Sequence, residues 1–165
     1  MKHGKECRVL VVGAGHAGIE ASLAAARCGT RVALITISKN SVGRMSCNPS
    51  VGGLAKGQMV REIDVLGGVM GVAADFSGIQ FKMLNKSKGR AVWSPRAQVD
   101  KRIYEKYVNE RIIKEPLIDI IESEAVSLDI NKGRVAGVKT VDGTVIRSEA
   151  VVLTNGTFLN GLIHV

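Results

Sequence analysis

The chain of 165 residues lacks several features that would assign it to a specialised class. No apolar run approaches the roughly 20 residues of a membrane span, and residues 1–7 leave no room for a signal peptide, so we expect a cytoplasmic protein. Its three cysteines are an odd number without a C-x-x-C pair, which argues against a disulfide framework and a metal site. With 45% hydrophobic residues, the chain is long enough for one domain over residues 1–165.

Acidic residues are absent from a long internal segment. No Asp or Glu occurs between Ala21 and Arg61, although this segment contains six cations: Arg27, Arg31, Lys39, Arg44, Lys56 and Arg61. A second group of cations lies between Lys82 and Arg102, and the whole chain has a formal charge of +8. This pattern predicts a phosphate or nucleic-acid partner, and the alternative interpretation is a solvated face that only aids solubility.

The glycine pattern near the N-terminus is the most specific motif. Gly13-x-Gly15-x-x-Gly18 directly follows a β-branched run from Arg8 and precedes a run that favours a helix. In this context the first glycine permits a tight turn, the second admits a pyrophosphate, and the third allows close packing of helix and strand. The motif therefore predicts a dinucleotide at the N-terminus of a helix.

The end of the next expected strand, residues 31–37, leaves the choice of dinucleotide open. Dinucleotide-binding folds usually have an acidic residue here, whereas this chain continues with Thr36-Ile-Ser-Lys-Asn40. A hydroxyl of Thr36 or Ser38 at the ribose would favour FAD or NAD. Lys39 facing an additional phosphate would favour NADP.

The middle of the chain predicts a functional loop and two helices. Residues 38–57 are rich in Ser, Asn and Gly and place Cys47 in a loop that could surround an anionic or flat group. Residues 58–74 have helical periodicity, which Gly67-Gly68 should weaken. Ser94-Pro95 resembles a helix start, with Ser as the N-cap, before a helical pattern that includes Tyr104 and Tyr107.

The last third of the chain changes to a period of two residues. Residues 118–130, 134–141 and 144–147 predict a three-stranded antiparallel meander at about 118–148, in which Asp142-Gly143 forms a hairpin turn. Residues 150–154 predict a return to a buried parallel sheet. The fold class is therefore α/β, a Rossmann-like FAD-binding domain with a parallel sheet and a meander, as in flavoproteins that bind two dinucleotides.

Six further motifs occur together in one family. They are Ser46-Cys-Asn-Pro-x-x-Gly-Gly-x-x-Lys-Gly57, Glu62-x-Asp-x-Leu-Gly-Gly68, Gly78-Ile-Gln-Phe81, Ser87-Lys-Gly89, Arg96-Ala-Gln98 and Gly156-Thr-Phe-Leu-Asn-Gly161. Over almost its whole length the chain resembles the N-terminal part of the tRNA uridine 5-carboxymethylaminomethyl modification enzymes, the GidA or MnmG family.

The resemblance implies an FAD enzyme that modifies carbon 5 of the wobble uridine of tRNA together with an MnmE-type GTPase partner. Methylenetetrahydrofolate would supply the carbon, NADH would reduce the flavin, and the full-length form would be a homodimer. Cys47 would be catalytic, because thiolate addition at carbon 6 makes carbon 5 of uracil nucleophilic. The cofactor-binding residues that the resemblance implies are Gly13, Ala14, Gly15, His16, Ala17, Gly18, Thr36, Asn48, Val126, Gly156 and Thr157.

The chain departs from the family pattern in two ways, and three alternative functions stay open. Arg90 replaces the proline that usually follows Ser87-Lys-Gly89, and the chain is several times shorter than family members, so we expect an N-terminal fragment that is inactive alone. The alternatives are a folate-dependent tRNA uridine methyltransferase, an NADP oxidoreductase and a non-catalytic nucleotide-binding or RNA-binding module. The Ser46-Cys-Asn-Pro49 segment argues against the methyltransferase.

Overall fold

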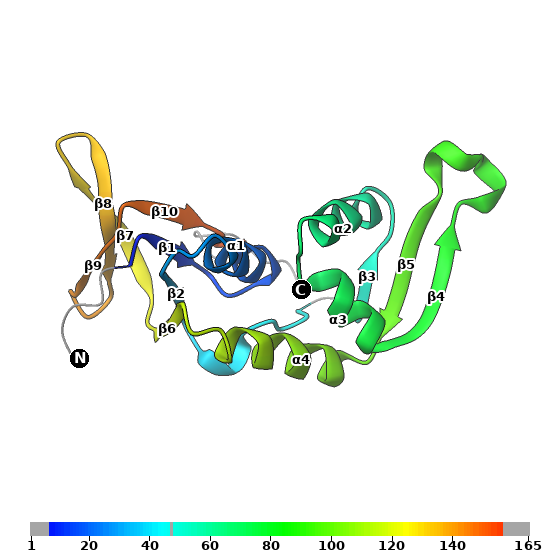
Figure 1. Ribbon diagram of the computed structural model, residues 1–165, viewed down its shortest axis with the longest axis horizontal. Coiled ribbons are helices and arrows are strands. Elements are labelled where there is room, and N and C mark those ends of the chain that lie inside the picture. Colours follow the sequence, from blue (N-terminus) through cyan, green and yellow to red (C-terminus); the bar gives the residue numbers. More distant parts are fainter. Residues whose placement is uncertain (1–6, 47, 157–165) are drawn as a thin grey trace, which may run out of the picture. The chain divides into compact units, whose positions relative to one another are not determined.

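The computed structural model describes residues 7–46 and 48–156 (Figure 1). The chain divides into two compact units. The first unit contains the chain up to Gly43 and again from Ile112, and the second unit contains Arg44–Arg111. Within residues 7–46 and 48–156, no helix combines the length and the apolar character that a membrane span requires.

A parallel sheet forms the centre of the first unit. Its strands are β1 (Val9–Val12), β2 (Val32–Thr36), β6 (Ile118–Glu122) and β10 (Ala150–Leu153), in the order β10-β1-β2-β6. All five residues of β2 are buried, as expected for a central strand covered on both faces. The expected β-α-β arrangement is confirmed, with α1 (His16–Arg27) joining β1 to β2.

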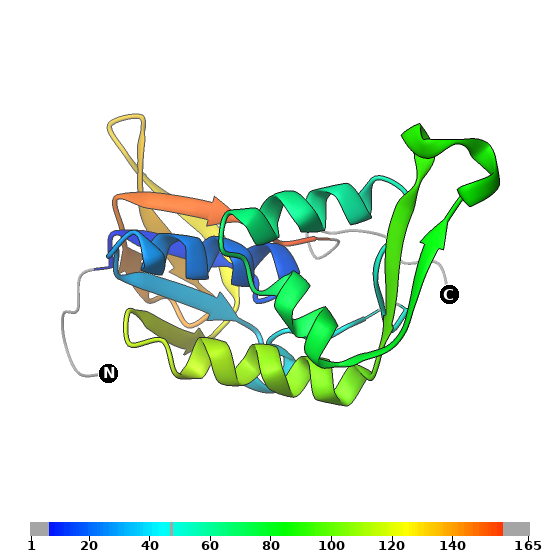
Figure 2. The same ribbon diagram turned by 45° about the vertical axis from the view of Figure 1, so that its right-hand side comes forward.

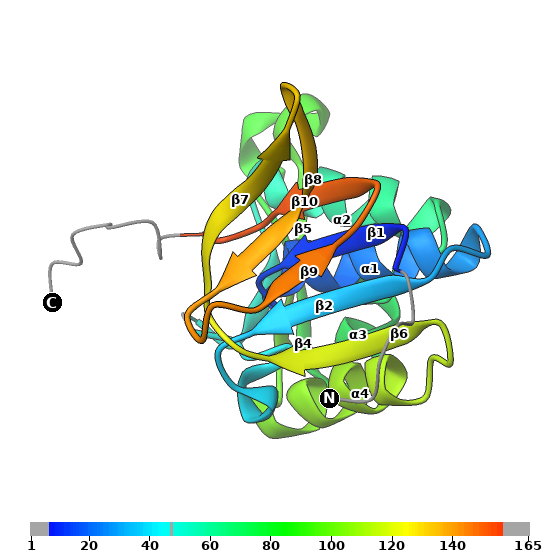
Figure 3. The same cartoon turned by 90° about the vertical axis from the view of Figure 1, so that its left-hand side faces the viewer.

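An antiparallel meander covers the face of this sheet opposite α1 (Figure 3). Its strands are β7 (Ala125–Asn131), β8 (Arg134–Thr140) and β9 (Val145–Arg147). Val138 of β8 packs in one cluster with Leu10, Val12, Ala33 and Ile35 of the parallel sheet. The fold class deduced from the sequence is therefore confirmed, including the Asp142-Gly143 turn between β8 and β9.

The expected long strand over residues 118–130 is instead two strands in different sheets. β6 pairs in parallel with β2, and only β7 joins the meander. The change occurs at Ser123, whose amide donates to the carbonyl oxygen of Thr36 at 2.9 Å, and at Glu124, whose carbonyl accepts from Val141 at 2.9 Å. These two bonds anchor the connection to both sheets, so the meander begins at Ala125 and not at Ile118.

The second unit combines helices with a small antiparallel sheet (Figure 2). Its strands are β3 (Ser50–Gly52), β4 (Gly78–Leu84) and β5 (Ser94–Val99), in the order β3-β5-β4. Two helices, α2 (Lys56–Val65) and α3 (Met70–Phe76), replace the single helix expected over residues 58–74. The helix ends at the glycine pair because Gly67 has a φ of +84°, which helical backbone does not allow.

The expectation that Ser94-Pro95 starts a helix is wrong. Residues 94–99 form β5, the central strand of the sheet, and the helix α4 (Lys101–Ile113) begins only after this strand has ended. Asp100 provides the cap, since its Oδ1 accepts from the amides of Arg102 and Ile103 at 2.9 and 3.0 Å. Tyr104 of α4 is fully buried and forms part of the core.

The strand β4 was not expected from the sequence, although a signal for it exists. Ile79, Phe81 and Met83 alternate with polar residues over the length of the strand, which is the period of a half-buried strand. Short 3₁₀ helices complete the described part of the chain: η1 (Lys39–Ser41) follows β2, and η2 (Lys86–Lys88) and η3 (Arg90–Val92) join β4 to β5.

Candidate functional site

The glycine loop lies between the end of β1 and the start of α1, as the motif predicts. Gly13 has a φ of +100° and its amide donates to the carbonyl oxygen of Ile35 on β2 at 2.8 Å. Gly15 is the N-cap of α1 in extended conformation, and as a glycine it has no side chain with which to cap this helix. The first amides of α1 are therefore available to an anion, which the helix dipole would also favour.

Two of the three glycines are required by contacts within the protein. A Cβ atom on Gly18 would collide with the carbonyl oxygen of Gly13, and it would lie 2.7 Å from Oγ1 of Thr154. A Cβ atom on Gly13 would lie 2.6 Å from the carbonyl oxygen of Thr154. Both residues are thus glycines because strand, loop and helix approach one another closely.

Gly15 has no such explanation within the described residues. A Cβ atom there would have no heavy atom within 4 Å, and the residue's φ of −74° suits any amino acid. Gly15 and Ala17 are exposed, whereas Ala14 and Gly18 are buried. The loop therefore has a packed side and an open side, and Gly15 keeps side-chain atoms off the open side.

Thr154 stabilises the loop from the neighbouring strand, and the sequence analysis did not identify it. Its Oγ1 lies 2.8 Å from the carbonyl oxygen of Val12 and 3.0 Å from that of Gly13, and its amide donates to Val12 at 2.9 Å. These residues lie near opposite ends of the chain. Only the parallel pairing of β10 with β1 brings them together.

An acidic side chain lies beside the end of β2, but it comes from the neighbouring strand β6 and not from β2 itself. Glu122 is the parallel partner of Thr36, and its Oε1 accepts from the amide of Lys39 at 3.1 Å. The hydroxyl of Thr36 donates to the carbonyl of Ser38 at 3.2 Å, and Oγ of Ser38 accepts from Asn40. Both candidate hydroxyls thus lie at the end of β2, beside a carboxylate.

Val126 lies close to the same edge of the sheet. The register of β7 against β8 shifts between Ala125 and Ser127, so Val126 has no partner in the ladder. The side chain of Val126 is 53% exposed. A bulge of this kind leaves backbone groups free of regular pairing and is frequent beside binding sites. The preceding Ser123 is bonded to Thr36, which places this bulge near the end of β2.

The first unit therefore brings most of the expected cofactor residues to the carboxyl edge of one parallel sheet. This edge is the usual ligand site of open α/β sheets. Asn48 belongs to the second unit, where its carbonyl accepts from Ser50 at 2.8 Å. Cys47 and Thr157 lie outside the described residues. The residues at the edge of the first unit are Gly13, Ala14, Gly15, His16, Ala17, Gly18, Thr36, Val126 and Gly156.

The two described cysteines differ in environment. Burial raises the pKa of the Cys7 thiol, whose Sγ donates to the carbonyl oxygen of Arg147 at 3.2 Å, whereas Cys28 is exposed. A raised pKa reduces the thiolate fraction and hence the reactivity of Cys7 at neutral pH. Across the described part of the chain, no cluster of three or more His, Cys, Asp or Glu residues could hold a metal ion.

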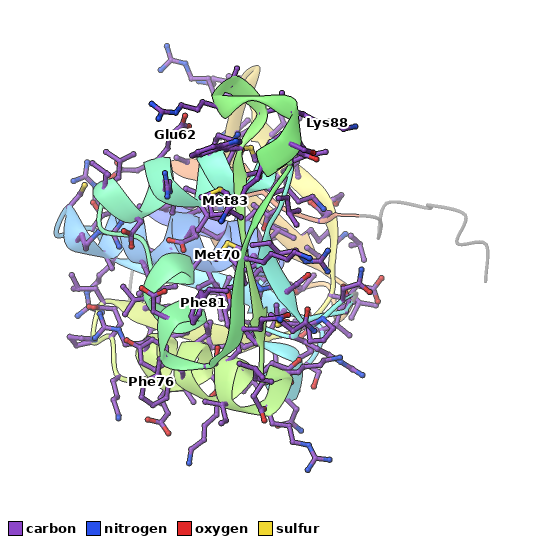
Figure 4. The ribbon with its side chains drawn as sticks, turned by 90° about the vertical axis from the view of Figure 1, so that its right-hand side faces the viewer. Glu62, Met70, Phe76, Phe81, Met83 and Lys88 are labelled. Atoms are coloured by element: carbon purple, nitrogen blue, oxygen red, sulfur yellow. The ribbon has the colours of Figure 1, made fainter. Side chains whose placement is uncertain are left out.

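The second unit contains a cavity of about 450 Å³. It lies against α2, α3, β4 and β5, and the charged residues of its lining are Arg61, Asp64, Asp75, Lys82 and Arg96. Figure 4 shows Met70, Phe81 and Met83 gathered between the helices and β4. Acidic and basic groups are mixed in this lining, so the cavity has no strong preference for an ion of one sign.

Known proteins resemble this chain in sequence over nearly the whole length of the chain. The family described as glucose inhibited division protein A matches residues 8–165. The tRNA uridine 5-carboxymethylaminomethyl modification enzyme MnmG of Endomicrobium trichonymphae is 53% identical over 160 residues, which are 97% of this chain and 27% of that protein. The chain thus spans about a quarter of the length of that relative.

Solved structures agree in fold. Aquifex aeolicus GidA, in its form I crystal, is 51% identical and superposes with a TM-score of 0.89 over 94% of this chain and 26% of its own. The GidA-related protein from Thermus thermophilus is 22% identical, with a TM-score of 0.58 over 93% of this chain and 54% of its own. At that identity the second likeness concerns the fold alone.

Proposed function

Because the chain belongs to the GidA family, we propose that it is the FAD-binding portion of an enzyme that modifies carbon 5 of the wobble uridine of tRNA. The modification is the carboxymethylaminomethyl group in the name of the relatives. The whole reaction requires the longer polypeptide of the family, so this chain alone is inactive. For an enzyme that acts on tRNA, we expect a location in the cytoplasm.

The observation that carries the FAD proposal is the open space at Gly15. Packing explains why Gly13 and Gly18 are glycines, whereas Gly15 has no side chain to cap α1 and leaves the N-terminus of this helix accessible from outside. A pyrophosphate fits this position, because it would accept hydrogen bonds from the amides and interact favourably with the helix dipole. The ribose would lie near Thr36, and the backbone of Val126 would contact the adenine end. When bound, FAD would supply the redox chemistry.

Glu122 favours FAD over NADP. Its carboxylate lies at the end of β2, where the ribose of a dinucleotide would be bound, and it accepts from the amide of Lys39. A 2′-phosphate near this carboxylate would experience repulsion, whereas ribose hydroxyls could donate to it. The NADP alternative, which depended on Lys39, is therefore the weaker one.

The remaining parts of the reaction are proposed from the family alone. Cys47 is the candidate nucleophile: its thiolate forms a bond to carbon 6 of uracil, and the electron pair of the ring double bond moves to carbon 5. After carbon 5 has gained its substituent and lost its proton, the bond between sulfur and carbon 6 breaks. We also propose that methylenetetrahydrofolate supplies the carbon and that NADH reduces the flavin. The full-length protein would act as a homodimer together with an MnmE-type GTPase.

The FAD proposal is tested by calorimetric titration of the purified chain with FAD, NAD and NADP. We expect FAD to bind most tightly, and Gly15→Val to abolish this binding without unfolding the chain, because the side chain would occupy the open side of the loop. Ala24→Val adds similar bulk at an exposed position of the same helix and should leave binding unchanged. Tighter binding of NADP than of FAD would refute the proposal.

The role of Cys47 is tested by alkylation with iodoacetamide at pH 7, followed by mass spectrometry. We expect Cys47 to react faster than Cys7, whose buried thiol has a raised pKa, and faster than Cys28. In a chain of family length, Cys47→Ser should retain FAD and lose uridine modification. A fully active serine variant would assign the nucleophile to another residue.

A further inference from the structure

One face of the β3-β5-β4 sheet in the second unit is polar. Because successive side chains alternate between the faces of a sheet, directly paired residues share a face. Two neighbouring rows of paired residues make up what we call the polar face. They are Ser50–Gln98–Gln80 and Gly52–Arg96–Lys82.

The opposite face of this sheet is its buried side. Val51, Ala97 and Val99 are all less than 10% exposed there, and α2 and α3 contact β3 and β5. In Figure 2 these two helices lie on one side of the strands. The residues of the polar face are exposed or half-buried, so an external ligand can reach them.

The cations of the polar face are placed opposite each other. Lys82 and Arg96 are direct cross-strand partners, an arrangement that destabilises a sheet through repulsion. Neither cation forms an ion pair within the described residues, although both border the cavity that Asp64 and Asp75 also line. Arg96 is held in place by Ser50, whose Oγ accepts from Nη2 at 3.1 Å. An anion between the two side chains would relieve the repulsion.

The amides of the polar face are also paired. Gln80 and Gln98 are direct cross-strand partners, and their side chains make no hydrogen bond to other described residues. Each amide offers a donor and an acceptor in one plane. Two adjacent amides can match the imide edge of uracil, in which one N–H donor lies between two carbonyl acceptors.

The two rows are about 7 Å apart, the repeat of two residues along a strand. This spacing suits a single nucleotide, with its base at one row and its phosphate at the other. We propose that the polar face binds a uridine nucleotide, with Gln80 and Gln98 at the base and Lys82 and Arg96 at the phosphate. The inference rests on the proposed function, because it assigns substrate-recognition residues to the same enzyme.

The test is a nuclear magnetic resonance titration of the FAD-saturated chain with uridine 5′-monophosphate. FAD occupies the glycine loop and so prevents the nucleotide from binding there. We expect the amide signals of Gln80, Lys82, Arg96 and Gln98 to shift saturably. Inorganic phosphate should bind more weakly, and cytidine 5′-monophosphate should also bind more weakly because its edge presents a different order of donors and acceptors.

Matched variants separate this site from general attraction to basic groups. Lys82→Ala should weaken the binding of uridine 5′-monophosphate about tenfold, as expected for the loss of one charge-assisted contact. Lys88→Ala removes the same charge from η2, at the end of the hairpin shown in Figure 4, and should have little effect. Gln98→Glu should weaken the nucleotide more than it weakens inorganic phosphate, whereas Gln58→Glu on the exposed surface of α2 should alter both slightly and equally.

The outcomes distinguish this inference from the FAD proposal. Equal effects of Lys82→Ala and Lys88→Ala, equal affinity for the two nucleotides, or shifts confined to other residues would overturn the nucleotide site while FAD binding stays intact. A chain that binds no FAD but shows the expected shifts would refute the FAD proposal and support the nucleotide site.

Discussion

Alanine substitutions at Gly15 and Gly18 should have opposite consequences, although both residues belong to one motif. The Gly18→Ala side chain would collide with the Gly13 carbonyl oxygen and approach Oγ1 of Thr154. A backbone carbonyl cannot rotate away, so either the helix or the loop must move. At Gly15 the added methyl group meets no atom of the described chain.

The magnitudes follow from these contacts. Overpacking costs up to about 3 kcal/mol, and the better helix propensity of alanine returns about 1 kcal/mol, so Gly18→Ala should lose about 2 kcal/mol of unfolding free energy. This loss corresponds to a decrease in Tm of about 4–8 °C for a chain of this size. At Gly15 the cost of alanine at an N-cap, about 1 kcal/mol, is largely offset by the reduced entropy of the unfolded chain.

Thermal unfolding by circular dichroism without FAD, combined with FAD titration, measures both effects. We expect Gly15→Ala to keep the Tm within about 2 °C of that of the unsubstituted chain. It should weaken FAD binding by about tenfold, because the added methyl group occupies the open side of the loop. Gly18→Ala should lower the Tm of the FAD-free chain. If Gly15→Ala destabilised the FAD-free chain as much as Gly18→Ala, the distinction between a packed and an open side would be wrong.

Three further predictions concern stability and charge. Thr154→Val removes the hydroxyl that bonds the glycine loop and should cost about 1–2 kcal/mol in urea unfolding, and an unchanged midpoint would contradict this role. Hydrogen bonds from the Thr140 hydroxyl, and then from Thr144, lower the pKa of Asp142 in the folded chain. The ionised Asp142 therefore stabilises the folded chain above the unfolded pKa of about 3.9, and this contribution is lost as the pH falls through the pKa of Asp142 in the folded chain. Between about pH 5 and pH 3 the unmodified chain should therefore lose more stability than Asp142→Asn, and parallel losses would exclude the effect. The chain should bind tRNA weakly, with log K falling against log salt with a slope of about −0.7 to −0.9 per neutralised phosphate, and binding that does not depend on salt would exclude a role for the cations between Lys82 and Arg102.

Local patterns in the sequence were sufficient wherever neighbouring residues decide the structure. The strand, glycine loop and helix of residues 9–27 lie where the motif predicts. The hairpin at Asp142-Gly143 and the helix break at Gly67 also follow from local backbone preferences, because glycine adopts positive φ at little cost. Ser94-Pro95 shows the limit of this approach. Its local signal suits a helix start, yet pairing with both β3 and β4 places residues 94–99 in a strand.

The sequence by itself therefore determined the fold class, the dinucleotide motif and the family, since these depend on short segments read in order. Only the tertiary structure decided which strands are neighbours, and it thereby brought Thr154 to the glycine loop and Glu122 to the end of β2. It also paired Lys82 with Arg96 and Gln80 with Gln98 on one face. The physical reason is that β-sheet hydrogen bonds join segments at any separation along the chain, so no local pattern specifies the partner of a strand.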